Sequence, residues 1–234
     1  MTTIDIANDS LDGLSVGDAL GAQFFVPGRS VAELLAGRPP AGPWEWTDDT
    51  EMACSVLSEL RTRGRIDPTA LAAVFADRCE PYRGYSGGTV ALLHQIRDGR
   101  PWAEAAAALF DGRGSWGNGA AMRVAPLGAF LAGDLDRAAA EAASSAEVTH
   151  AHPEAIVGAM AVAVAASHAA NARGRDCAPG ELAITACVEA GGDADTTAAI
   201  VGGIVAARTG IGGEGGVPAG WLEAREELPD WGRS

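Results

Sequence analysis

Two short acidic segments carry the residue types best suited to chemistry: Thr47-Asp48-Asp49-Thr50 and Asp193-Ala194-Asp195-Thr196-Thr197. Each precedes a run of apolar residues at helical spacing, where aspartate and threonine are also ordinary N-caps. A cap needs only one side chain, whereas each segment offers two carboxylates and two hydroxyls. Adjacent carboxylates repel each other unless a cation offsets them, and Mg²⁺ and Mn²⁺ prefer oxygen ligands. The residues alone leave both interpretations open: a pair of helix caps, or a metal site.

Three loop segments add polar groups that could bind a ligand. Gly117-Asn118-Gly119 opens a predicted helix and offers free backbone N–H groups to an anion such as a diphosphate, although the same tripeptide is a common turn. His150 and His152 lie two residues apart before Pro153. They could be metal ligands or polar loop residues, or one of them could orient a ribose hydroxyl. Ser86 lies in a glycine-rich helix entry that either lines a pocket or simply turns the chain.

The elements that must position these segments are predicted to be helices almost throughout. β-branched alternation is nearly absent, so we expect an all-α fold in which residues 1–234 form a single compact multi-helix domain. We expect Pro126 to kink the helix that contains it. Apolar spacing predicts helices at Leu11–Leu20, Val31–Leu35, Thr47–Arg61, Pro68–Cys79, Thr89–Arg97, Trp102–Phe110, Ala120–Leu131, Leu135–Glu147, Pro153–Ala172, Ala178–Ala190, Thr196–Thr209 and Trp221–Glu227.

Composition excludes several classes of function. The net charge is −14 with no lysine, which argues against stable binding to nucleic acid, since phosphates need basic neutralisation. The most apolar stretch, Ala155–Ala166, is shorter than the roughly 20 residues that span a bilayer. It therefore predicts a helix buried on all sides rather than a membrane protein.

The remaining signals concern the cellular compartment and assembly. The N-terminus has neither a basic start nor an apolar run, so it is not a secretion signal. The four cysteines, Cys54, Cys79, Cys177 and Cys187, form no CxxC pair, which favours reduced buried thiols in the cytoplasm. No segment marks an oligomer interface, and we expect a monomer.

Taken in order, the motifs resemble those of the ADP-ribosylglycohydrolase family, which includes the dinitrogenase-reductase-activating glycohydrolases and the J-crystallins. Any one fragment is unspecific, but six in family order make chance improbable. The six matching pieces are Gly13-Leu14-Ser15-Val16-Gly17-Asp18-Ala19-Leu20-Gly21, Trp46-Thr47-Asp48-Asp49-Thr50-Glu51-Met52, Tyr85-Ser86-Gly87-Gly88-Thr89, Gly117-Asn118-Gly119-Ala120-Ala121-Met122-Arg123-Val124-Ala125-Pro126, Thr149-His150 and Gly191-Gly192-Asp193-Ala194-Asp195-Thr196-Thr197-Ala198.

The resemblance implies a cleft with a binuclear Mg²⁺ or Mn²⁺ site at helix N-termini, and cleavage of the bond between ADP-ribose and an acceptor. It implies that the metal ligands are Thr47, Asp48, Asp49, Asp193, Asp195 and Thr196. It also implies that the diphosphate and distal ribose are held by Gly117, Asn118, Gly119 and Met122, with His150 beside them; we add Ser86 as a substrate-binding candidate. Asp48 or Asp49 is the expected catalytic group, activating water or protonating the leaving group.

Two departures from the family pattern keep alternatives open. The chain looks shorter than many relatives, with a compact connection before the second acidic segment. Phe25 stands where many relatives carry a glutamate, and Glu33 and Glu45 are candidate substitutes in the same region. A non-catalytic descendant that binds ADP-ribose or serves structurally is the main alternative. An unrelated metal-dependent phosphohydrolase is another, which would use His150 and His152 as ligands. The group to which ADP-ribose is attached in the substrate could be arginine, serine, a nucleobase or a small molecule.

Overall fold

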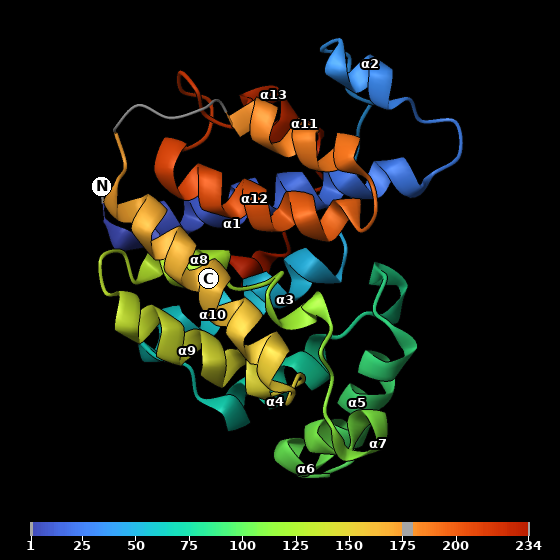
Figure 1. Ribbon diagram of the computed structural model, residues 1–234, viewed down its shortest axis with the longest axis vertical. Coiled ribbons are helices and arrows are strands. Elements are labelled where there is room, and N and C mark those ends of the chain that lie inside the picture. Colours follow the sequence, from blue (N-terminus) through green and yellow to red (C-terminus); the bar gives the residue numbers. More distant parts are fainter. Residues whose placement is uncertain (1, 175–179, 234) are drawn as a thin grey trace.

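The computed structural model describes residues 2–174 and 180–233, and helices dominate this part of the chain (Figure 1). Its only β-type pairings are two isolated bridges, Trp44 with Arg225 and Ile211 with Val217. The expectation of an all-α multi-helix fold is confirmed. The helices are α1 (Thr3–Ala22), α2 (Val31–Leu35), α3 (Asp48–Arg63), α4 (Pro68–Arg78), α5 (Gly87–Arg97), α6 (Trp102–Ala107), α7 (Leu109–Gly112), α8 (Ala125–Phe130), α9 (Leu135–Glu147), α10 (Pro153–Asn171), α11 (Gly180–Ala190), α12 (Ala194–Thr209) and α13 (Ala219–Ala224), with 3₁₀ turns at Gln23–Phe25, Pro81–Arg83, Asn118–Ala120 and Asp230–Gly232.

Helices α1 and α12 form the central pair, because small residues let their backbones approach closely (Figure 1). A Cβ atom at Gly17 of α1 would lie 2.0 Å from the carbonyl oxygen of Ala198 in α12, and one at Gly21 would lie 2.5 Å from that of Ala194. Gly13 makes a similar approach one turn earlier. The pairing runs antiparallel, so the C-terminal end of α1 meets the N-terminal end of α12.

The other helices pack around this pair. Helix α8 lies against both α1 and α10, α9 covers α10 from outside, and α11 packs on α12 (Figure 1). Helix α3 contacts both α1 and α4. Helix α4 in turn packs against α5, and α5 against α6. The N-terminal ends of α3, α5 and α12 therefore come from different parts of the packing, and the site described below lies where they converge.

Helix α10 is long and apolar enough to pass a membrane-span criterion based on length and composition. It nevertheless packs against α8, α9 and α12, and it buries Ala155, Ala159 and Ala163 along one face. The prediction of a helix buried on all sides is wrong, because Val157 on the opposite face is 60% exposed. A core helix with one solvent-facing side accounts for these features.

The first helix, α1, starts at Thr3 and not at the predicted Leu11. Two further predicted helices have limits that differ beside the cavity. The expected helix Ala120–Leu131 begins only at Ala125, because Asn118–Ala120 forms a 3₁₀ turn; Pro126 therefore lies in the first turn of α8 and kinks nothing. The expected helix Trp102–Phe110 ends at Ala107 and is followed by the short α7, in which Phe110 has φ 53° and Asp111 φ 58°. Both differences expose backbone or aromatic groups beside the cavity described below.

The structure describes three of the four cysteines, and the predicted burial holds for two of them. Cys54 and Cys79 are buried free thiols, and Cys187 is a free thiol that is half-buried. Cys177 and Ala178, the start of one predicted helix, lie outside the described residues.

Candidate active site

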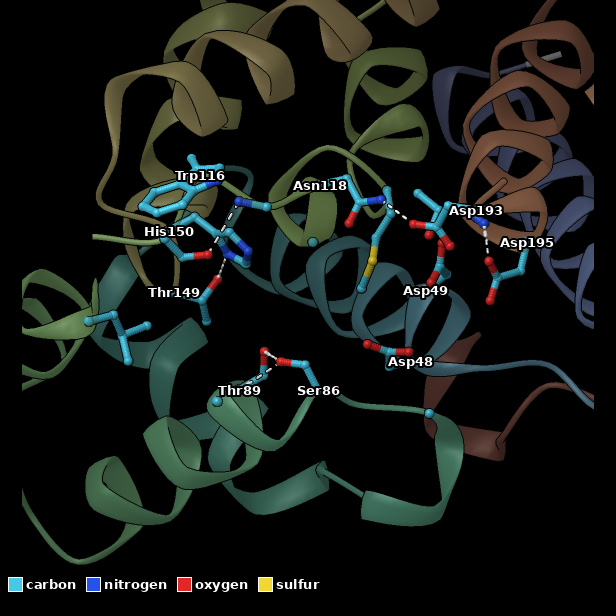
Figure 2. A pocket seen from close by; sticks show the side chains of 18 of the residues that line it. Asp48, Asp49, Ser86, Thr89, Trp116, Asn118, Thr149, His150, Asp193 and Asp195 are labelled. Carbon is cyan, nitrogen blue, oxygen red and sulfur yellow. Dashed lines mark hydrogen bonds between the residues drawn. The ribbon is translucent and has the colours of Figure 1, made fainter. Parts of the chain in front are cut away.

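A cavity of about 610 Å³ opens where the N-terminal ends of α3, α5 and α12 meet the loop before α8 (Figure 2). Aspartates lie on one side of it, glycines and a histidine on another, and aromatic side chains beside them. The lining residues are Asp48, Asp49, Gly84, Ser86, Gly88, Thr89, Leu109, Phe110, Ser115, Trp116, Gly117, Asn118, Gly119, Met122, Thr149, His150, Asp193, Asp195 and Thr196. The two acidic segments of the sequence thus contribute to one cavity.

The first acidic segment is held by an aspartate that the sequence analysis did not select. Asp18, fully buried in α1, accepts hydrogen bonds from the Thr47 backbone N–H at 2.9 Å and from the Thr47 hydroxyl at 2.8 Å. It also accepts from the Thr50 backbone N–H at 3.2 Å and the Thr50 hydroxyl at 2.5 Å. Thr47 is the N-cap of α3, so Asp18 fixes the turn that carries Asp48 and Asp49 into the cavity.

The second segment presents its carboxylates from the start of α12 (Figure 2). Asp195 Oδ1 accepts a 2.7 Å hydrogen bond from the backbone N–H of Thr196. Asp193 does not cap the helix with its side chain; instead its Oδ2 accepts a 2.5 Å hydrogen bond from the Asn118 side chain. This contact ties the glycine loop to the acidic side of the cavity.

Three carboxylates from three helices converge at this place. Oxygen atoms of Asp18, Asp49 and Asp195 all lie within 4.8 Å of one another. Asp49 Oδ1 is buried and has no hydrogen-bond partner among the described residues. Burial, reinforced by the charge of Asp18, raises the pKa of Asp49 well above its usual value. An unpaired buried carboxylate oxygen facing two further carboxylates is an arrangement that a bound divalent cation would relieve, so the donor set fits such an ion.

The neighbouring carboxyls respond to the same environment. Burial, then the charge of Asp18, raises the pKa of Asp48 to about 7. Burial, followed by a hydrogen bond with Asp193, raises the pKa of Asp195 to about 7. Both groups consequently exchange protons near neutral pH when no cation is bound, which is the range in which acid–base catalysis operates.

The glycine loop and His150 form the opposite side (Figure 2). A Cβ atom at Gly119 would lie 2.8 Å from His150 Cε1, so glycine is required for the loop to pass the ring. Met122 is buried and lines the same cavity. His150 is buried too, and this burial together with the charge of Arg123 lowers its pKa to about 3. The ring is neutral at physiological pH.

Ser86 and His152 occupy different kinds of position. Ser86 lines the cavity and is the N-cap of α5, where its oxygen accepts a 3.1 Å hydrogen bond from the Thr89 backbone N–H. His152 does not line the cavity; its Nδ1 accepts from the Glu154 backbone N–H at 3.2 Å and caps α10. The interpretation of His152 as a structural loop residue fits this geometry better than that of a ligand.

Two aromatic side chains beside the loop were not singled out from the sequence. Phe110 is 51% exposed and Trp116 45% exposed, and their ring centroids lie 4.6 Å apart. Trp116 also meets the His152 ring edge-on at 5.7 Å. Half-exposed aromatic faces on a cavity wall suit the stacking of a planar ligand group.

None of the acidic residues considered as substitutes near Phe25 lines the cavity. Phe25 itself is 55% exposed. Glu33 forms an exposed ion pair with Arg38, with 2.5 Å between Oε2 and Nε, and Glu45 is exposed. The third carboxylate beside Asp49 and Asp195 is instead Asp18.

Comparison with known proteins gives a consistent result. A family model described as ADP-ribosylglycohydrolase matches residues 2–182 and 176–233. ADP-ribosylhydrolase ARH3 of Gallus gallus is 36% identical over 177 residues, which is 66% of this chain and 47% of that protein. ADP-ribosyl-[dinitrogen reductase] glycohydrolase of Rhodospirillum rubrum is 25% identical over 266 residues, covering 90% of this chain and 86% of that protein. The chain spans about half the length of the first curated relatives that it matches.

A solved structure extends this likeness to the fold. A chain titled "ADP-ribosylglycohydrolase-related protein complex" superimposes with a TM-score of 0.63 at 26% identity. The match covers 96% of this chain and 93% of that chain.

Proposed function

The chain belongs to the ADP-ribosylglycohydrolase family, and from this we propose that it is a divalent-cation-dependent hydrolase that cleaves the glycosidic bond between ADP-ribose and an acceptor. The observation that carries the proposal is the convergence of the buried Asp18 with Asp49 and Asp195, the last two of which line a cavity that also holds a glycine loop and exposed aromatic rings. The carboxylates can bind cations and a ribose, and the glycine loop can bind a diphosphate. The aromatic rings can stack on a nucleobase. The names of the relatives support the same reaction class.

The proposed cation ligands are side chains of the two acidic segments. We propose two ions, Mg²⁺ or Mn²⁺, held by Thr47, Asp48, Asp49, Asp193, Asp195 and Thr196. Thr47 donates its hydroxyl hydrogen to Asp18 and accepts from the Asp49 backbone N–H at 3.4 Å, which leaves one oxygen lone pair for a cation. When bound, such ions supply positive charge that orients ribose hydroxyls and offsets the acidity of the site. The carboxylates of Asp48, Asp49, Asp193 and Asp195 balance the charge of two divalent ions.

The proposed reaction uses the carboxyls nearest the cavity. As the glycosidic bond breaks, its electron pair passes to the acceptor heteroatom and positive charge develops at the anomeric carbon, which nearby carboxylates stabilise. A water oxygen forms the new bond to that carbon. Asp48 or Asp49 either takes the proton of this water or delivers a proton to the leaving heteroatom. Asp48 faces the cavity with a pKa near 7 and can hold or release a proton at neutral pH.

The rest of the cavity suits the remainder of ADP-ribose. The loop of Gly117, Asn118 and Gly119 is proposed to contact the diphosphate through the backbone N–H groups of its last two residues, because the Gly117 N–H donates to Ser115 Oγ at 3.3 Å. Met122 lines the same cavity. The exposed rings of Phe110 and Trp116 are proposed to stack on adenine. Ser86, which lies across the cavity from the loop (Figure 2), is proposed to contact the distal ribose or the acceptor. The acceptor is an ADP-ribosylated protein, a nucleobase or a small molecule.

The first test is calorimetric titration with ADP-ribose, the product common to every candidate substrate. Binding that requires Mg²⁺ or Mn²⁺, disappears in EDTA and is lost in Asp195→Ala supports the site. Hydrolysis is then measured on ADP-ribosylated arginine and serine peptides and on an ADP-ribosylated nucleobase. Binding without hydrolysis of any of these would favour a non-catalytic ADP-ribose-binding protein. Absence of binding in every condition would contradict the proposal.

Cation binding is expected to stabilise the protein more at pH 8 than at pH 5.5. Without cations, the raised pKa values of Asp48 and Asp195 mean that the folded state binds more protons than the unfolded state between about pH 4 and 7. The free energy of unfolding then falls as pH rises through that window. Mg²⁺ at about 100 times its Kd should raise the Tm by about 5–10 °C at pH 8. At pH 5.5 protons compete with Mg²⁺ for the carboxylates, so the increase in Tm should be smaller.

The measurement is differential scanning fluorimetry, with NaCl of equal ionic strength as the control. Equal Mg²⁺ shifts at the two pH values would contradict a carboxylate cation site.

Replacement of Trp116 by alanine is expected to weaken ADP-ribose binding about tenfold or more, because stacking on an aromatic ring contributes about 1–3 kcal/mol per base. The affinity for ribose 5-phosphate, which has no base, should stay unchanged. Tyr82→Ala removes an aromatic side chain that is 74% exposed and lies outside the cavity lining, and it serves as the control. Competition titrations measure both ligands. Equal losses for the two ligands would place the base elsewhere.

A further inference from the structure

A buried arginine connects the two non-acidic walls of the cavity. Arg123 has no exposed surface, and its guanidinium donates to the carbonyl oxygen of Gly119 at 3.1 Å and to the hydroxyl of Thr149 at 3.0 Å. A further nitrogen donates to the carbonyl oxygen of Ser145 at 2.5 Å. Among the described residues, the groups that accept hydrogen bonds from it are all neutral. The hydrogen bonds of this guanidinium therefore hold the glycine loop and the segment that ends in His150 at a fixed separation.

The contact with Arg123 determines the direction of the next hydrogen bond. A guanidinium only donates, so Thr149 Oγ1 accepts, and the hydroxyl hydrogen must find a second acceptor. Thr149 is 1% exposed, and the other polar atom at hydrogen-bond distance from its hydroxyl is His150 Nδ1, at 2.7 Å (Figure 2). If Nδ1 carried a proton, the buried hydroxyl hydrogen would lack an acceptor among the described residues, which is costly. Nδ1 therefore accepts the hydrogen bond and carries no proton.

The opposite nitrogen of the ring faces the cavity. His150 lines it, and Nε2 lies 3.0 Å from where a Cβ atom at Gly119 would be and 3.6 Å from the same position at Gly117. No described residue makes a hydrogen bond with Nε2. The ring is neutral at pH 7, as its lowered pKa shows, so its single proton resides on this cavity-facing atom.

We propose that Arg123, acting through Thr149, is a positioning residue that holds His150 in a single neutral tautomer with the proton on Nε2, so that the ring donates a hydrogen bond to an oxygen atom of the bound ligand. The identity of that ligand, ADP-ribose, rests on the proposed function; the proton assignment does not. In this state Nδ1 is occupied and Nε2 is already protonated. His150 thus selects acceptor oxygens of a phosphate or ribose and takes no part in removing a proton from water.

The test of the proton assignment is ¹⁵N-resolved NMR of the histidine side chains at pH 7, with the His150 signals identified by their loss in His150→Gln. In the wild type we expect Nε2 to be protonated and Nδ1 unprotonated, in one population. Thr149→Val keeps the shape of the side chain but removes the hydroxyl, and should produce a mixture of tautomers. Thr149→Ser keeps the hydroxyl and should restore the wild-type pattern. A wild-type ring protonated on Nδ1, or a pattern unchanged in Thr149→Val, would overturn the proposal.

Ligand binding supplies the second readout. Thr149→Val should weaken ADP-ribose binding in calorimetry about twofold for an equal mixture of tautomers, because only rings protonated on Nε2 can donate, and Thr149→Ser should bind like the wild type. An unchanged affinity in Thr149→Val would overturn the donor role of Nε2. If the tautomer depends on Thr149 as expected but the wild type does not bind ADP-ribose, the proposed function and the ligand part of this inference fail, while the role of the Thr149 hydroxyl in fixing the ring is supported.

Discussion

Gly17→Ala is expected to lower the free energy of unfolding by about 3 kcal/mol or more. The added Cβ would lie 2.0 Å from the carbonyl oxygen of Ala198 and 2.5 Å from its carbonyl carbon, both of which are backbone atoms. No flexible side chain can yield there, so α1 and α12 must separate. This cost exceeds the gain of about 1 kcal/mol that alanine brings over glycine inside a helix.

The consequence of that substitution extends to the site. Asp18 follows Gly17 directly in α1, and Asp195 lies at the start of α12, so separating the two helices spreads the carboxylate cluster. Urea denaturation measures the stability, and the Mg²⁺-dependent Tm shift measures the cluster. Gly158→Ala in α10 is the matched control, because nothing lies within 4 Å of its Cβ position; it should be neutral or stabilising by up to about 1 kcal/mol. A Gly17→Ala protein as stable as the wild type would show that the close helix contact does not limit the fold.

The sequence predicted those parts of the site that are marked by a pattern of neighbouring residues. Asp48, Asp49, Asp193 and Asp195 each lie at a helix start that capping chemistry and apolar spacing already indicate, and the structure places all four on one cavity. The all-α fold followed in the same way, from periodicity that each helix carries by itself.

Asp18 shows why the rest was missed. It reaches Thr47 across 29 residues of sequence, and its four hydrogen bonds exist only once α1 and α3 have packed. In the sequence it is one polar residue in a glycine-rich helix, without a neighbouring acidic residue to mark it. A buried aspartate among helix-packing glycines was the available signal, since a charged residue inside a small-residue interface needs a polar partner.

The aromatic side chains were missed for a conformational reason. Helical spacing from Trp102 onward predicts a continuous helix through Phe110, which would leave that ring as one more surface residue. The positive φ angles of Phe110 and Asp111 break the helix and bring the Phe110 ring against Trp116. Non-glycine residues rarely adopt this conformation, and a propensity argument cannot anticipate it.

Asp48→Asn is expected to lower kcat/KM for hydrolysis by about 10²–10⁴-fold, the contribution of a positioned acid or base. Asparagine keeps the shape of the side chain, and the cap of α3 is retained because Thr47 supplies it. The carboxylate is lost as a proton carrier and as a cation ligand. Because burial and the charge of Asp18 oppose ionisation at this position, the neutral amide should leave the stability of the cation-free protein unchanged or higher above pH 7.

A matched variant separates catalysis from a general loss of acidic charge. Asp136→Asn makes the same change in the first turn of α9, at an exposed position outside the cavity, and should keep wild-type activity. ADP-ribose affinity divides the two roles of Asp48: a loss of turnover with retained, Mg²⁺-dependent binding identifies the proton-transfer role, whereas loss of both identifies cation binding. Turnover in Asp48→Asn equal to that of Asp136→Asn would remove Asp48 from the mechanism. Asp49, whose unpaired oxygen lies in the same cluster, would then be the catalytic group to test.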